Sequence, residues 1–316
     1  MAIFYAFCCL GFSAGNDFIF KLFARKNRSR GLFMAVIGLV SAVLFMLIPE
    51  DPLTPAKVRA TLIWGVIGGF FSVSANILLI ESMSRMGAGV CSTIYRLNMA
   101  IVVPMAVLLF GESLNWMQWI GVGFALAAVL CFLPSGKEAS GSKKSASKVA
   151  FAMIITAAVL RAGMGLAYKY GFSIGASPLK VNAITGVSWL VFGIAYLYFR
   201  EYRGGAVVKD FISAKVAGYG VLSGGLVMGI TYTMAFGLKA GDASIVLSIA
   251  QMGFLLTFFL SVLILHEKVT PFKVTAMLCG VVALSLLSYK PADKKVETEV
   301  ETPAEVQKNT VALSGK

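Results

Sequence analysis

Long apolar stretches recur along the whole chain, and short polar or charged segments separate them. A helix needs about 20 apolar residues to cross a hydrocarbon core roughly 30 Å thick, and about ten stretches meet this requirement. They are continuously apolar and do not alternate with a period of two, which predicts transmembrane helices rather than the strands of a barrel. The predicted spans lie near residues 2–22, 31–49, 60–81, 87–110, 115–134, 148–172, 178–200, 215–238, 241–265 and 270–289.

The composition also indicates a chain embedded in a membrane. Of 316 residues, 58% are hydrophobic and only 14% are charged, and the mean hydropathy is +0.82. Soluble proteins average about 45–50% apolar and about 25% charged residues. The net charge of +13 comes mainly from Lys and Arg between the spans, where cytoplasmic loops collect them, so it does not indicate a nucleic-acid partner. We therefore predict an all-α integral membrane protein.

The spans fall into two sets of five. A polar segment rich in Ser, Gly and Lys at 135–147 follows the fifth span, and we interpret it as a linker. It separates a first unit, residues 1–134, from a second unit, residues 148–290. The tail at 291–316 is polar, mixed in charge and nearly free of aromatic residues, which predicts disorder.

The two units resemble each other in sequence. An offset of about 155 residues aligns them without a gap and pairs Gly65 with Gly220, and an offset of about 148 near their starts pairs Lys21 with Lys169. Such self-similarity predicts an internal duplication. Because each unit has an odd number of spans, the two copies must cross the membrane in opposite orientations. This is the inverted-repeat plan of secondary transporters, which bind substrate near the bilayer midplane.

The end of the fourth span carries a motif. The run LLFGES, followed by LNWMQWIGVGFALAAVLCF, places Glu112 after that span and Gln118 and Gly121 at the start of the fifth. The pattern resembles the second half of an EamA domain of the drug/metabolite transporter (DMT) superfamily. The second unit keeps Glu267 in the corresponding place but has Lys273 instead of the Gln. Nearly the whole chain to about residue 290 fits two such domains.

The resemblance implies a secondary active transporter that moves a small polar metabolite by alternating access. Amino acids, other metabolites, drugs and nucleotide sugars are all substrates within the superfamily, so a multidrug or cation exporter is the alternative. The expected partners are a small-molecule solute, the lipid bilayer, and a proton or counter-solute for coupling. We expect a monomer or homodimer in the bacterial inner (plasma) membrane.

Two arginines lie inside predicted spans at similar depth. A charge near the bilayer centre costs about 2.5–3.5 kcal/mol on insertion scales, so it normally faces the bundle interior and serves a function. Arg96 lies near the middle of the fourth span, and Arg161 lies in the sixth. Arginine keeps its charge, and its planar fork fits a carboxylate or phosphate, so the pair predicts an anion site. Neutralisation of each arginine by a protein carboxylate or by helix-end carbonyls is the alternative.

Other polar residues inside the spans extend this candidate site. The repeat offset makes Gln251 the counterpart of Arg96, which gives the site a charged side and a hydrogen-bonding side. Single Ser and Thr residues are weak signals, because their hydroxyls often bond their own helix. The candidate substrate-binding residues are Arg96, Arg161, Tyr95, Asn98, Gln251, Asn76, Thr231 and Lys169.

Asp17 and Lys21 are spaced i, i+4 on the first span, which predicts a local ion pair. The alternative is that Asp17 is the carboxylate that couples transport to protons. Lys169, near the end of the sixth span, could contact solute or extend its charged end to the interface. Pro104 removes one backbone hydrogen bond in the fourth span and predicts a kink beyond Arg96.

An enzyme or a channel fits the sequence less well. Intramembrane enzymes need clusters of His, Asp, Glu or Cys, whereas the sole histidine, His266, lies in a predicted turn and the five cysteines lie inside spans without metal-ligand spacing. We therefore expect no metal and no cofactor. Channels usually form a ring or filter, and no filter-like segment is present.

The loop charges bear on orientation. The odd-numbered loops carry about 14 Lys and Arg against about 4 in the even-numbered loops, which places the odd loops in the cytoplasm and both termini outside. The resemblance implies the opposite, with both termini inside. The two expectations remain open alternatives.

Overall fold

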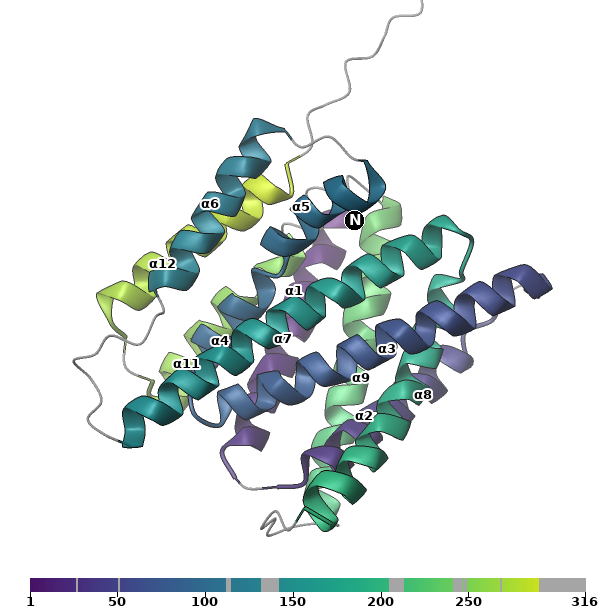
Figure 1. Cartoon of the computed structure of the whole chain (residues 1–316), viewed down its shortest axis with the longest axis horizontal. Coiled ribbons are helices and arrows are strands. Elements are labelled where there is room, and N and C mark those ends of the chain that lie inside the picture. The colour runs from purple at the N-terminus through teal and green to yellow at the C-terminus, as the bar shows by residue number, and fades with distance from the viewer. Residues whose placement is uncertain are drawn as a thin grey trace, which may run out of the picture.

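Every element described in the structure is a helix (Figure 1). Glu112, the tail at 291–316 and most of the segment 135–147 lie outside the described residues. The computed structural model describes residues 1–26, 28–50, 52–111, 115–131, 142–204, 213–240, 246, 249–267 and 269–289.

In the first half, each predicted span contains a helix, and the fourth span contains two. The helix at the fifth span is somewhat shorter than predicted, and the third is longer at both ends. The helices are α1 (Ala2–Ala24), α2 (Arg30–Met46), α3 (Pro55–Met83), α4 (Ala88–Arg96), α5 (Met99–Phe110) and α6 (Trp116–Cys131).

The second half has a similar series. The first of its helices starts at Ser142, inside the predicted linker, because the run from 142 to 148 contains neither Gly nor Pro and can extend the helix beyond the apolar stretch. The beginning of the predicted ninth span, 241–248, lies mostly outside the described residues. The helices are α7 (Ser142–Ser173), α8 (Pro178–Tyr196), the π-helix η1 (Leu197–Tyr202), α9 (Ala214–Ala240), α11 (Gly253–Leu265) and α12 (Pro271–Leu287).

The described helices differ in whether they are long enough to span a bilayer. Six segments are long and apolar enough by length and composition, and four further apolar helices have 10–17 residues. The short ones are Arg30–Met46, Trp116–Cys131, Ile249–Leu265 and Pro271–Leu287. A count of ten membrane-spanning helices therefore remains a prediction.

Helix starts follow simple local rules. Proline occupies the first turn of α3, α8 and α12, where its missing N–H leaves no bond unmade. The hydroxyl of Ser29 accepts a hydrogen bond from the backbone N–H of Leu32 at the start of α2, and Ser177 does the same for Lys180 at the start of α8.

The helix packing is nearly unchanged when the two halves are exchanged. Corresponding helices pack on each other in the pairs α2–α8 and α6–α12, and α4 packs on α11 where the two fourth spans meet. The other main contacts occur in matched sets: α1–α9 with α3–α7, α2–α9 with α3–α8, and α1–α11 with α5–α7. Figure 1 shows two of these pairs, with α6 beside α12 and α7 beside α3. Two repeats related by a twofold axis would produce this pattern.

α2 and α8 cross closely and run antiparallel. A Cβ on Gly31 would lie 2.5 Å from the backbone N of Leu197, and a Cβ on Gly38 would lie 2.5 Å from the carbonyl O of Gly186. As residue numbers increase along α2, the contacted residue numbers on α8 and just after it decrease. Gly38 and Gly186 are counterparts under the offset of 148, and only glycine permits their backbones to approach so closely.

A carboxylate from each half binds the start of the second helix of the other half. Glu201 accepts hydrogen bonds from the Ser29 hydroxyl at 2.6 Å and from the backbone N–H of Arg30 at 2.8 Å. Glu50 accepts a hydrogen bond from the Ser177 hydroxyl at 2.6 Å. Negative charge is favourable at a helix N-terminus, so these reciprocal contacts fix α2 and α8 against each other at both ends.

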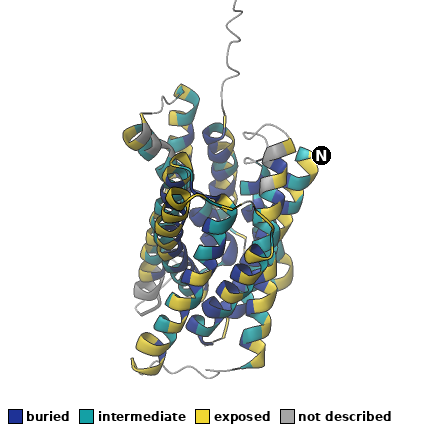
Figure 2. Cartoon of the chain, turned by 90° about the vertical axis from the view of Figure 1, so that its right-hand side faces the viewer, coloured by how far each residue is buried: buried dark blue, intermediate teal, exposed yellow. Residues whose placement is uncertain are grey.

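Burial places the core between the helices and apolar side chains on the outside. Figure 2 shows buried residues on the inner sides and exposed residues on the outer sides of the helices. Several outward residues are large and apolar, among them Leu108 at 77%, Trp116 at 64% and Phe272 at 69% exposed. Apolar surface on this scale fits contact with lipid chains rather than water.

Candidate functional site

The fourth helix of each half is interrupted at the same position. α4 ends at Arg96 and α5 begins at Met99, and between them Leu97 has φ −71° and ψ 4°. In the second half Met252, just before α11, has φ −74° and ψ 7°. The offset of 155 makes Met252 the counterpart of Leu97. The two halves therefore share one backbone conformation at the break.

The hydrogen bonds at the two breaks also agree. The backbone N–H of Leu97 donates to the carbonyl of Ile94 at 3.2 Å as well as to that of Thr93 at 3.1 Å, and that of Met252 donates to Ile249 at 3.1 Å. The bonds to Ile94 and Ile249 span three residues, as in a tightened helical turn. Pro104 lies inside α5, beyond the break. Because the second half breaks without a proline at the corresponding position, the proline does not account for the interruption.

Arg96 contacts residues from two other elements. Its Nη2 lies 3.3 Å from Oδ2 of Asp17 on α1, and the two side chains are 15% and 6% exposed. Its Nη1 donates to Oε1 of Gln251 at 3.3 Å. Its Nε is buried and has no hydrogen-bond partner among the described residues. The two residues paired by the repeat offset, Arg96 and Gln251, are therefore in direct contact.

Asp17 has a partner that its local sequence did not predict. Its Oδ2 also accepts a hydrogen bond from the hydroxyl of Ser92 at 2.5 Å. The prediction of a local ion pair between Asp17 and Lys21 was wrong. Asp17 instead pairs with Arg96, and Lys21 lies at the end of α3. Helical spacing brings i and i+4 side chains together only when no stronger tertiary partner is within reach.

Lys21 and Glu267 join three helix ends. Lys21 Nζ donates to the carbonyl of Met83, the last residue of α3, at 2.8 Å and to that of Met86, beyond the helix end, at 2.6 Å. It also lies 3.6 Å from Oε1 of Glu267. The same Oε1 accepts the backbone N–H of Ala88, which starts α4, at 3.0 Å. The positive charge of Lys21 is favourable at the carbonyl end of α3, and the negative charge of Glu267 is favourable at the N–H end of α4. The pair therefore fixes the position of α4, the helix that carries Arg96.

Tyr95 and Arg161 lie beside this cluster. Tyr95 is 7% exposed, and its hydroxyl has no hydrogen-bond partner among the described residues. The Cζ of Arg161, on α7, lies 5.7 Å from the centre of the Tyr95 ring. Arg161 Nη1 lies 3.2 Å from the sulfur of Met164. The described part of the chain offers Arg161 no carboxylate within ion-pair distance.

The remaining predicted site residues lie at varying distances from the cluster. Asn76 is buried and donates to the carbonyl of Ser72 in its own helix. Thr231 likewise donates to a carbonyl of α9. Asn98 lies within the break, just before α5. Lys169 lies two turns beyond Arg161, about 12 Å along α7, so it does not belong to the central cluster.

Sequence reasoning missed two central polar contacts. Ser92 precedes Arg96 by four residues and so lies on the same face of α4, a signal that could have identified it. The hydroxyl of Ser223 on α9 donates to the buried side chain of Asn16. No spacing within the sequence connects that second pair, because it joins two helices from different halves.

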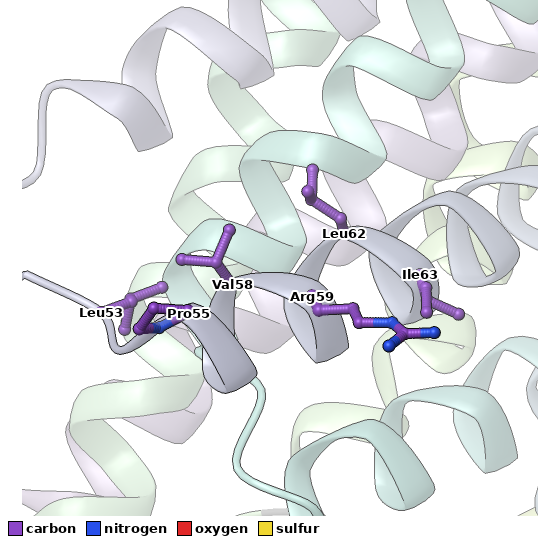
Figure 3. A pocket seen from close by; sticks show the side chains of 6 residues that line it. All are labelled: Leu53, Pro55, Val58, Arg59, Leu62 and Ile63. Carbon is purple, nitrogen blue, oxygen red and sulfur yellow. The ribbon is translucent and has the colours of Figure 1, made fainter.

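Two surface cavities lie away from the cluster, at the start of α3. The larger has a volume of about 490 Å³ and opens outward beside exposed side chains (Figure 3). Its neighbour, of about 330 Å³, extends towards Glu50 and Lys180. Neither contains a residue of the central cluster, and we assign neither a role in the function. The larger cavity is lined by Leu53, Pro55, Val58, Arg59, Leu62 and Ile63.

Within the described residues, no group of three His, Cys, Asp or Glu side chains could hold a metal ion. The cluster around the break is thus built from ionic and hydrogen-bonding side chains. Such side chains can bind a polar solute or exchange partners with it.

The comparisons with known proteins agree with this architecture. The model of the EamA-like transporter family matches residues 1–133 and 148–289. Of the solved chains, 27 match, and one described only as "Crystal structure of protein" is 14% identical. The match covers 92% of this chain and 99% of that chain, with a TM-score of 0.59. At this identity, the likeness shows the fold alone. No curated protein matches the chain.

Proposed function

Because the chain belongs to the EamA-like transporter family, and is thus a multi-pass integral membrane transporter of the DMT superfamily, we propose that it is a secondary carrier working by alternating access. Its cargo is a small polar metabolite that carries a carboxylate or phosphate. Family members are transporters rather than enzymes, so we assign no catalytic residues.

The proposed architecture has ten spans in two inverted five-helix repeats, with units at 1–134 and 148–290. Three observations support it: the antiparallel crossing of α2 and α8, the reciprocal carboxylate contacts at their ends, and a contact pattern that survives exchange of the halves. Inverted repeats provide alternating access because each half can rock against the other around a fixed central site. We place the carrier in the bacterial inner membrane.

The observation that carries the proposal is the paired break in the fourth helices. Carriers of this plan bind solute where interrupted helices meet near the midplane. Here the two breaks bring Arg96 and Gln251 into contact. The proposed site comprises Arg96, Arg161, Tyr95, Asn98, Gln251, Asn76, Thr231 and, at its periphery, Lys169.

The charges of the cluster support an anionic group on the cargo. The cluster holds two arginines, Arg96 paired with Asp17 and Arg161 over the Tyr95 ring, and one carboxylate, so the centre carries a positive excess. This balance disfavours the alternative of a multidrug or cation exporter. Asp17 is the proposed proton-coupling residue, because protonation would release Arg96 from its only ion-pair partner among the described residues.

Counterflow in proteoliposomes tests the carrier mechanism. Vesicles with the wild-type chain are preloaded with a mixed metabolite extract, and uptake of labelled solutes is followed by mass spectrometry. A carrier gives saturable uptake that preloading accelerates, whereas a channel gives non-saturating uptake without acceleration. Protein-free vesicles measure the leak. Non-saturating flux, or flux equal to the leak, would contradict the proposal.

A further inference from the structure

The two central arginines differ in the partners that they already have. Arg96 is neutralised by Asp17 at 3.3 Å and bound by Gln251 at 3.3 Å. Arg161 has the sulfur of Met164 at 3.2 Å and the face of the Tyr95 ring at 5.7 Å. A thioether is a weak acceptor, and a ring face attracts a cation more weakly than a carboxylate does. Arg161 therefore has unused capacity to bind an anion.

The Tyr95 hydroxyl gives an independent indication of a ligand at the same place. It is buried and has no hydrogen-bond partner among the described residues, although burying an unpaired hydroxyl costs about 1–3 kcal/mol. Such an atom in a native structure calls for an explanation. A solute oxygen bound beside Arg161 would accept its hydrogen bond. The Asn76 side chain lies close by, and its amide nitrogen donates to the carbonyl of Ser72 in its own helix.

The charge around this hydroxyl limits what the solute can carry. The charged side chains beside it are Arg161, whose Cζ lies 5.7 Å from the centre of the Tyr95 ring, and the neighbouring ion pair of Arg96 with Asp17. The carboxylate cancels one guanidinium, which leaves one positive charge. A single carboxylate would balance it, whereas a second negative charge would lie in a buried site without a counter-charge, at high cost.

Resting on the proposed carrier function, we propose that Arg161 and Tyr95 form the subsite that receives the solute, and that it accepts a group with one carboxylate and no second negative charge. The guanidinium of Arg161 and the hydroxyl of Tyr95 each donate to the carboxylate. Arg96 is the positioning residue. Its hydrogen bond to Gln251 joins the two halves, and its ion pair with Asp17 holds it in place, so it is not the first contact of the solute.

This assignment narrows the substrate class. Monocarboxylates and zwitterionic amino acids present one carboxylate, whereas dicarboxylates and phosphate esters carry more negative charge. A guanidinium binds both carboxylates and phosphates, so charge rather than geometry separates the two classes here.

Binding and counterflow are measured on the same purified full-length chain. Thermal stabilisation in detergent and counterflow in vesicles use one panel of labelled monocarboxylates, amino acids, dicarboxylates, sugar phosphates and quaternary amines. Stabilisation reports binding to the folded state without requiring transport. The variants are Arg161→Gln, Arg161→Lys and Tyr95→Phe. Arg59→Gln is the matched control, because Arg59 lines the surface cavity on α3 away from the cluster.

The proposal predicts that wild type selects solutes with one carboxylate. Arg161→Gln raises their half-saturating concentration roughly 10- to 100-fold, as loss of a hydrogen bond to a charged group does. Arg161→Lys keeps the positive charge but loses the planar fork of the guanidinium. Its half-saturating concentration therefore lies between those of wild type and Arg161→Gln. Tyr95→Phe raises it about 3- to 10-fold without lowering the melting temperature, because the hydroxyl has no protein partner to lose. Arg59→Gln behaves like wild type.

Preferential uptake of dicarboxylates, phosphate esters or quaternary amines would overturn the proposal. So would unchanged half-saturation in both Arg161→Gln and Tyr95→Phe, or a panel that neither stabilises the protein nor crosses the membrane. If one-carboxylate solutes stabilise wild type but not Arg161→Gln, and no solute undergoes counterflow, the subsite stands and the carrier function fails.

Discussion

The breaks in the fourth helices, at Leu97 and Met252, have the same backbone and different chemistry. Their φ and ψ angles agree within a few degrees, and both use the same short-range hydrogen bonds. Only the first half places an arginine there, and it faces Gln251 of the second half. The shared backbone is therefore a property of the fold. The difference between Arg96 and Gln251 lies in the side chains, and we attribute the transport function to this difference.

The ends of the same helices repeat this lesson. Gly111 follows α5 with φ 66°, and its counterpart His266 follows α11 with φ 52°. Both adopt the left-handed conformation, which favours glycine. The second half keeps the turn although it carries a less suitable residue. Backbone geometry is thus the conserved part of this duplication, and side chains have diverged around it.

The largest expected effect comes from removing the charge at the first break. Arg96→Gln makes the two breaks chemically alike and leaves Asp17 buried without its ion-pair partner. We expect transport to fall roughly 100-fold or more and the free energy of unfolding to fall by about 3 kcal/mol. Counterflow and chemical denaturation measure the two effects.

A double variant separates charge burial from function. Adding Asp17→Asn to Arg96→Gln removes the stranded carboxylate, so stability should recover while transport stays lost. Wild-type transport by Arg96→Gln alone would refute the functional difference between the breaks.

A smaller effect is expected from the neutral side of the pair. Gln251→Leu removes one hydrogen bond between the halves but keeps the Asp17–Arg96 ion pair. A net hydrogen bond contributes about 0.5–1.5 kcal/mol, so we expect transport to fall by about 3- to 10-fold. Gln251→Glu, which would compete with Asp17 for Arg96, is a more severe companion variant. A loss as large as that of Arg96→Gln would argue against the division of roles.

The helix ends give a smaller and purely structural pair of effects. Gly111→Ala places a Cβ in the left-handed region with no neighbour within 4 Å, so backbone strain alone should cost about 1–2 kcal/mol of stability. His266→Gly relieves the same strain and should raise stability by about 0.5–1 kcal/mol. Denaturation curves of both variants measure these changes. Shifts in the same direction would show that the two turns are not equivalent.

The smallest effect is expected at Pro104. The second half breaks without a proline, so Pro104→Ala should leave the interruption in place and change transport by less than about twofold. Hydrogen exchange of the backbone amides near residues 97–100 follows the break directly. Strong new protection there would mean that the proline maintains the interruption after all.

Apolar length and the repeat predicted most of the fold. Each predicted span overlaps an observed helix, because continuous apolar segments in a membrane must satisfy their backbone groups internally. The offset of 155 pairs Arg96 with Gln251 on sequence alone, and the two side chains are in contact. The start of α7 at Ser142 was missed, since polar helical turns carry no hydropathy signal.

Tertiary partners were the part that the sequence did not reveal. Spacing on one helix suggested that Asp17 pairs with Lys21, but Asp17 binds Arg96 and Lys21 binds the end of α3. The break in the first half was also missed, because neither Gly nor Pro lies beside Leu97 to mark it, whereas Gly253 follows Met252 in the second half. Both features depend on how helices from the two halves pack, which no single segment encodes.

The ratio of transport rates in Arg96→Gln and Gln251→Leu tests the central claim most directly. Counterflow of the solute selected by wild type is measured for both variants in matched vesicles, with the amount of folded protein determined in each. We predict that Arg96→Gln retains at most about one tenth of the Gln251→Leu rate. Equal rates would contradict the claim that Arg96 and Gln251, at the equivalent breaks of the two halves, have different roles in transport.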